Sequence, residues 1–147
     1  MKISTTLFGE IEIDKTKILT FEDGIPAFPD AREFILIHDE EATESMFSWL
    51  LCITDPEIMF VIADINLIIP DYSPSLNDKE LSALSDKEDS EFVLYAIANV
   101  ADELSETTIN LKAPIVINLE TQKAKQMVAE NDEFPIRYQV FTAGKEV

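Results

Sequence analysis

Short alternations of apolar and polar residues recur along most of the chain, as expected for strands that are buried on one face. Gly, Pro and Asp residues that are typical of turns separate these runs. The predicted strands are Phe8–Ile13, Lys17–Phe21, Phe34–Ile37, Phe47–Thr54, Met59–Ala63, Phe92–Asn99, Thr107–Lys112, Ile115–Leu119 and Ile136–Phe141. Many short strands with few helices predict a mainly β fold, an antiparallel barrel or sandwich with one or two short helices.

Two of the predicted strands differ in how their apolar residues are distributed. In Phe47–Thr54, one face carries Phe47, Trp49, Leu51 and Ile53, and this alternation predicts that Trp49 is buried. In Met59–Ala63 both faces are apolar, which is typical of a central strand that is covered on two sides.

A short helix is predicted over Asn77–Leu84, because Asn77 can cap it and Leu81 and Leu84 share one face. About two turns of helix are marginal alone, so this helix must dock against the strands. Residues 121–130 fit either a helix or a strand: Ala124, Met127 and Val128 suit a helix face, whereas the alternation of lysines and glutamines permits a strand.

The length of 147 residues and a 46% share of apolar residues predict a single globular domain. We assign residues 1–141 to this domain and residues 142–147 to a flexible C-terminal tail. The N-terminal residues lack the apolar run of a signal peptide, and no apolar run is long enough to span a membrane. A single cysteine, Cys52, fits a reducing compartment, so we expect a cytoplasmic protein.

The net charge of −18 lies almost entirely in the middle of the chain. Residues 30–70 carry nine acidic residues and one basic residue, and residues 71–106 carry ten and two. Such a surface repels nucleic acid, because affinity for phosphates depends on Lys and Arg. It would attract a basic protein partner, or it would serve solubility alone.

The residue types that carry catalysis and metal binding are scarce. His38 is the single histidine and precedes three acidic residues, while Cys52 lies within an apolar strand. One histidine and one cysteine cannot form a Cys/His zinc site, and the acid-rich stretch 86–91 lacks the spacing of a calcium loop. Three glycines cannot supply a phosphate-binding loop. The sequence therefore predicts neither an enzyme nor a metal site nor a cofactor.

One loop has the features of a binding surface. Pro70-Asp71-Tyr72-Ser73-Pro74 places an aromatic ring between two prolines, an arrangement that can present an exposed anchor to a partner. The alternative is that Tyr72 covers the edge of the core. The Asp55-Pro56 turn places Glu57 at a second exposed position.

Five segments in order resemble the family of the flagellar assembly factor FliW across nearly the whole chain. They are Phe8–Ile13, Thr20–Phe28, Asp55–Ile62, Pro70–Tyr72 and Asn110–Asn118. The resemblance implies a small cytosolic β-barrel-like protein without catalytic activity, and it favours a strand over residues 121–130. It also implies two partners, flagellin and the RNA-binding regulator CsrA.

In the function that the resemblance implies, binding to CsrA lifts the repression of flagellin translation, and free flagellin withdraws the factor. An acidic partner suits a regulator with a basic RNA-binding face. From exposure and motif we predict that Glu57, Asp71 and Tyr72 contact partners. Two rivals stay open: a β-barrel hydrolase that uses two carboxylates, and a generic chaperone for secreted flagellar subunits without a regulatory role.

Overall fold

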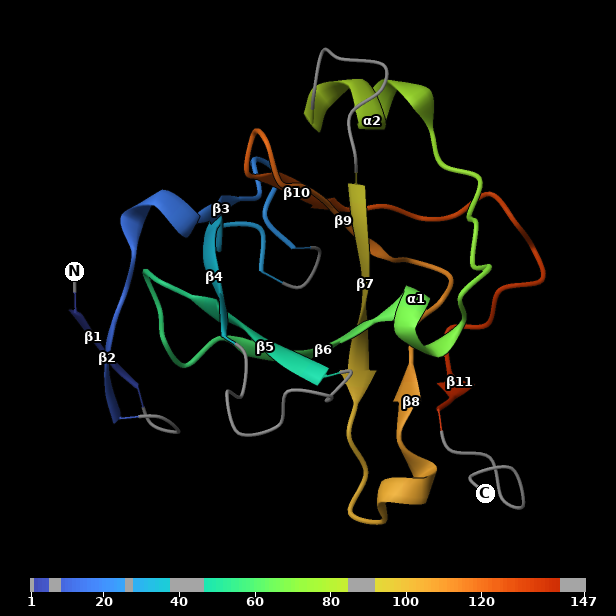
Figure 1. Cartoon of the computed structure of the whole chain (residues 1–147), viewed down its shortest axis with the longest axis horizontal. Coiled ribbons are helices and arrows are strands. Elements are labelled where there is room, and N and C mark those ends of the chain that lie inside the picture. The colour runs from blue at the N-terminus through green and yellow to red at the C-terminus, as the bar shows by residue number, and fades with distance from the viewer. Residues whose placement is uncertain (1, 6–8, 26–27, 38–46, 85–91, 141–147) are drawn as a thin grey trace.

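The computed structural model describes residues 2–5, 9–25, 28–37, 47–84 and 92–140 (Figure 1). His38, the stretch 86–91 and the predicted tail 142–147 lie outside these ranges. The described helices are α1 (Ile65–Ile68) and α2 (Asp78–Leu84), with single 3₁₀ turns at Lys15–Lys17 and Leu104–Glu106. The described strands are β1 (Lys2–Thr5), β2 (Gly9–Glu12), β3 (Leu19–Thr20), β4 (Glu33–Ile37), β5 (Phe47–Cys52), β6 (Met59–Asp64), β7 (Phe92–Asn99), β8 (Thr108–Ile109), β9 (Ile115–Asn118), β10 (Lys123–Gln126) and β11 (Tyr138–Gln139).

Seven strands close into a barrel in the order β7-β6-β5-β4-β3-β10-β9, because β9 pairs back with β7. All of these pairings are antiparallel except β3 with β10, which meet in parallel at one residue pair. Strands β8 and β11 extend the sheet beyond the ring, and β1 and β2 form a separate hairpin. The prediction of a mainly β, barrel-like fold with one or two short helices is confirmed.

Strand β7 is the seam of the barrel. Its first half, from Phe92 to Tyr95, pairs with β9, whereas Tyr95 to Ile97 pair with β6 on the opposite edge. Its last two residues pair with β8. Strands β8 and β9 therefore lie one after the other along a single edge of β7.

Four apolar clusters fill the fold. The barrel interior is built from fully buried side chains of opposite strands, among them Phe21, Phe34, Leu50, Ile62 and Ile117. A second cluster lies beneath α1, a third joins the β1–β2 hairpin to the outer faces of β4 and β5, and a fourth holds α2 against β9. The clusters extend burial to both sides of the central strands.

The prediction that Trp49 is buried is wrong. Leu50 and Cys52 line the barrel interior, so the interior face of β5 is the one that alternates with Phe47, Trp49, Leu51 and Ile53. Leu51 faces outward and is buried under the β1–β2 hairpin, whereas Trp49 is only half-buried. The two-sided burial predicted for β6 is found: Phe60 and Ile62 pack inward, and Met59 packs outward.

The predicted helix and the ambiguous segment are both resolved. The Asn77 side-chain oxygen accepts hydrogen bonds from the backbone N–H of Lys79 at 2.9 Å and of Glu80 at 3.1 Å, so Asn77 caps α2. Leu84 docks the helix against Val116 and Met127, as its short length requires. Residues 121–130 contain strand β10, which agrees with the strand that the resemblance favours.

Candidate partner-binding surface

The loop that carries Asp71 is held by one asparagine. The Asn66 side-chain amide donates to the Pro70 carbonyl at 3.5 Å and to the Tyr72 carbonyl at 3.4 Å. Asn66 itself is fixed at the start of α1, where its N–H donates to the Asp64 carboxylate at 3.2 Å. Asp71 is therefore exposed at a turn whose flanking carbonyls are both tied down.

Tyr72 lies in the core and not on the surface. Only 6% of the residue is exposed, and its ring packs on Phe134 with 4.9 Å between centroids. Its hydroxyl donates to the Leu111 carbonyl at 2.7 Å, and burial raises the pKa of the phenol to about 12. The expected exposure of Tyr72 is thus wrong, and the alternative, that it covers a core edge, is confirmed.

The far side of the same loop is joined to residues 129–134. The Asn131 side-chain oxygen accepts from the Ser75 N–H at 2.6 Å, and the Ser75 carbonyl accepts from the Glu130 N–H at 2.8 Å. The Lys112 ammonium donates to the Asn131 carbonyl at 2.7 Å. These contacts hold the loop that carries Asp71 against residues 130 and 131.

Glu57 lies in the tight turn between β5 and β6. The Asp55 carboxylate accepts from the Glu57 N–H at 3.3 Å, and the Asp55 carbonyl accepts from the Ile58 N–H at 2.9 Å. The turn closes where the Cys52 N–H donates to the Ile58 carbonyl at 2.9 Å. The Glu57 side chain is exposed, as predicted.

Glu57 and Asp71 are not brought together. Glu57 precedes β6, and Asp71 follows it after α1, so the six-residue strand separates them by roughly 20 Å. Figure 1 shows the β5–β6 turn and α1 at opposite ends of β6. The predicted acidic contacts therefore lie in two separate loops, one before β6 and one beyond α1.

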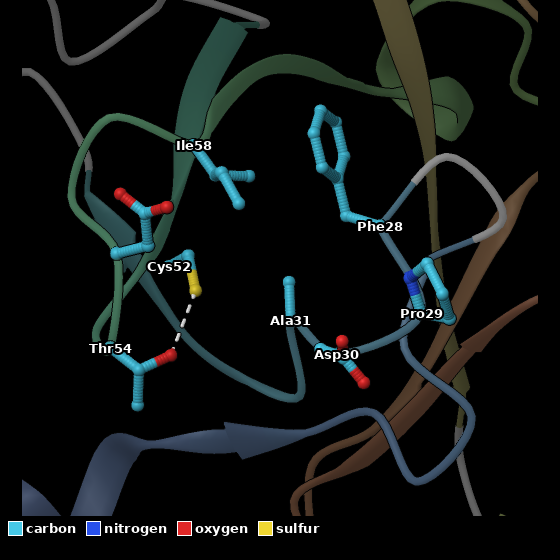
Figure 2. A pocket seen from close by; sticks show the side chains of 8 residues that line it. Phe28, Pro29, Asp30, Ala31, Cys52, Thr54 and Ile58 are labelled. Carbon is cyan, nitrogen blue, oxygen red and sulfur yellow. Dashed lines mark hydrogen bonds between the residues drawn. The ribbon is translucent and has the colours of Figure 1, made fainter.

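A pocket that the sequence did not reveal lies beside the Glu57 turn (Figure 2). It has a volume of about 320 Å³ and is lined by Phe28, Pro29, Asp30, Ala31, Cys52, Thr54, Asp55 and Ile58. Phe28 is 40% exposed although its ring packs edge-on against Phe60, with 6.0 Å between centroids. Two prolines near Phe28 in the sequence, Pro26 and Pro29, indicate an exposed loop. A single phenylalanine by itself indicates a buried position.

Gly24 shapes one wall of this pocket. Its φ of +68° lies in the left-handed region, and a Cβ there would approach the Pro29 carbonyl oxygen to 2.4 Å. The same turn is fastened by two hydrogen bonds between Ile25 and Phe28, at 2.6 and 3.3 Å. Gly24 thereby lets the backbone of Phe28 and Pro29 approach closely.

The chemistry available in the pocket is limited. The Cys52 thiol is fully buried and lies 3.4 Å from the Thr54 hydroxyl. Asp30 and Asp55 both line the pocket and are exposed to solvent. Within the described ranges, no three His, Cys, Asp or Glu residues are grouped to hold a metal ion. Nor does any helix of those ranges have the length and apolar character needed to cross a membrane.

Comparison with known proteins decides the family. The family model described as FliW protein matches residues 2–140. The chain belongs to the FliW family. It is similar to the flagellar assembly factor FliW of Lachnospira eligens, with 35% identity over 143 residues that cover 96% of this chain and 95% of the relative. The corresponding factor of Thermoanaerobacter pseudethanolicus is 35% identical over 140 residues, which cover 95% and 93%.

A solved FliW structure confirms the fold. The crystal structure of a flagellar assembly factor FliW superposes with a TM-score of 0.87 at 33% identity, covering 98% of this chain and 99% of that one. The resemblance that was inferred from five short segments is therefore confirmed, and it extends over the barrel, the pocket and the Asp71 loop.

The buried hydroxyl of Tyr72 makes a testable contribution to stability. Tyr72→Phe should lower the free energy of unfolding at pH 7 by about 1 kcal/mol, the usual value of one buried hydrogen bond. The phenol of Tyr72 has a higher pKa when folded than when unfolded, so its stabilisation is present below pH 10 and lost toward pH 12. Denaturant unfolding should show that the deficit of the variant shrinks over this interval. A deficit that is constant with pH would contradict the burial of Tyr72.

Substitutions at Gly24 and Gly9 can be compared directly. Both have positive φ, but a Cβ at Gly9 meets nothing within 4 Å, whereas at Gly24 it meets Pro29. Gly9→Ala should cost about 1 kcal/mol, which is the backbone cost alone, and Gly24→Ala should cost roughly 2–3 kcal/mol. Thermal or denaturant unfolding of the two variants measures the difference. Equal losses would show that the close approach of Pro29 to Gly24 relaxes without cost.

Proposed function

We propose that this chain binds two proteins in the cytoplasm, flagellin and the RNA-binding regulator CsrA, and that binding the regulator relieves its repression of flagellin translation. Membership of the FliW family over residues 2–140 is the observation that carries the proposal. Its relatives are named flagellar assembly factors, which agrees with a role in building the flagellum through protein contacts.

The arrangement of charge supports a basic partner. Two lysines of β10 are ion-paired with acidic residues of other segments: Lys123 with Glu22 at 3.3 Å, and Lys125 with Asp23 at 3.1 Å and Glu80 at 3.2 Å. Within the described part of the chain, the exposed carboxylates of Asp30, Asp55, Glu57 and Asp71 have no ion pair of this kind. Exposed carboxylates thus lie near both ends of β6, where they can steer a basic protein toward the loops.

The spacing of the two acidic ends supports exclusive binding. A standard interface buries about 800 Å² on each partner, a patch about 30 Å across. The two ends of β6 are closer than this, so a protein that covers one end would interfere with a second protein at the other. We propose Glu57 and Asp71 as direct contacts, and Tyr72 as the buried support of the Asp71 loop.

A reciprocal titration tests the proposed switch. Adding flagellin to a preformed complex with CsrA should release the regulator, and the reverse titration should release flagellin, with about 5–150-fold coupling in both directions. Competition followed by fluorescence anisotropy measures both affinities. A ternary complex with undiminished affinities would contradict the switch. Binding of flagellin without any binding of CsrA would favour a generic chaperone.

Charge-reversed variants in the same titrations locate the contacts. Glu57→Lys and Asp71→Lys should slow association with CsrA more than Glu10→Lys, an exposed control on the β1–β2 hairpin. The slowing should diminish above about 0.1 M salt, where screening shortens the range of the charge. Stability should stay within about 0.5 kcal/mol of the parent, because these side chains are exposed. Equal effects of all three variants would place the contacts elsewhere.

A further inference from the structure

The pocket of Figure 2 is suited to bury an apolar side chain. Phe28 and Pro29 form one wall, Ile58 lies opposite, and Ala31 and Cys52 close the remaining space. The Thr54 hydroxyl, a possible donor in this wall, lies within hydrogen-bonding distance of the Cys52 thiol. A polar group that entered the pocket would find few partners there, whereas an apolar group would lose contact with water.

The walls of the pocket are held by two hydrogen-bonded turns. Its volume of about 320 Å³ is about twice the ~150 Å³ of an engineered cavity that holds benzene, so one large aliphatic or aromatic side chain fits. The Gly24 turn fixes residues 28–31 on one side, and the Asp55 turn fixes the other. A preformed pocket binds without the cost of ordering its walls.

The rim of the pocket is acidic. Asp30 and Asp55 both line it and are both exposed, and Glu57 lies two residues beyond Asp55 in the same turn. None of these carboxylates is among the ion pairs of the described residues. When a side chain of a partner inserts into the pocket, the residues before and after it in the partner therefore lie against the carboxylates of Asp30 and Asp55.

We infer that this pocket receives a single apolar anchor residue from a basic segment of a partner protein, with Lys or Arg next to the anchor opposite Asp30 and Asp55. The inference rests on the proposed function in that the chain acts by binding proteins. It depends on neither partner by name, because the pocket selects by hydrophobicity and charge. A contact made by the acidic surface alone would depend strongly on salt. Insertion of an apolar anchor adds a contribution that does not depend on charge.

Three synthetic pentapeptides test the selectivity of the pocket. The first has a central leucine between pairs of lysines, the second replaces the leucine with serine, and the third replaces the lysines with glutamates. Nuclear magnetic resonance titration of the ¹⁵N-labelled full chain should show shifts at the amides of Ala31, Thr54 and Glu57 with the first peptide. The second and third should bind about tenfold more weakly or not at all. Equal binding of all three, or shifts confined to other residues, would overturn the inference.

Two substitutions separate the apolar and the charged contributions. Ala31→Met fills the pocket from its wall and should reduce binding of the leucine peptide about tenfold. The double variant Asp30→Asn with Asp55→Asn keeps the oxygen that caps the turn but removes both charges, and it should weaken binding while the fold is preserved. Glu10→Gln, an exposed control on the β1–β2 hairpin, should leave binding unchanged. A loss with Glu10→Gln as large as with the double variant would overturn the inference, because it would show attraction to net charge alone.

The same variants distinguish this inference from the proposed function. If Ala31→Met binds flagellin and CsrA as tightly as the parent and the peptides do not bind, the pocket inference fails and the proposed function stands. If the leucine peptide binds selectively but neither protein binds, the proposed function fails and the pocket inference stands.

Discussion

Strand β7 is paired on both edges, and the positions of the loops that we propose as contacts depend on that double pairing. Its first half joins β9 and its second half joins β6, so the ring closes within eight residues. Closure leaves no free edge inside the ring at this seam, and it fixes the register of β6 relative to the core. The two loops that we propose as contacts begin at the two ends of β6. Their separation and direction are therefore properties of the barrel more than of the loops themselves.

Local signals in the sequence predicted the elements well and their inward faces less well. The cap at Asn77, the strands and the Asp-Pro turn depend on residues that are close in sequence, and all are found. For β5, alternation distinguishes two faces but does not say which one lines the interior. That choice depends on the β1–β2 hairpin, which covers Leu51 from outside, and this contact joins residues that are far apart in the chain.

Tyr72 and Phe28 show the same limit in the candidate site. Two flanking prolines suggested that Tyr72 is exposed, but its hydroxyl meets a carbonyl 39 positions away and its ring meets Phe134. Phe28 packs its ring against Phe60 and yet forms an exposed wall of the pocket. The burial of each side chain depends on residues far away in the sequence, and the local spacing of residues does not reveal them. Asp71 and Glu57, in contrast, lie in turns defined by their immediate neighbours, and both are exposed as predicted.

The central claim is that partners bind to loops held rigidly at the two ends of β6, and hydrogen exchange of the complexes tests it most directly. Amide exchange would be measured for the chain alone, with flagellin and with CsrA. Slower exchange should appear in residues 53–58 and 69–75, while the strands of the barrel keep the rates of the free chain. Unchanged exchange in both loops, with protection in the β1–β2 hairpin or at β11 instead, would contradict the account.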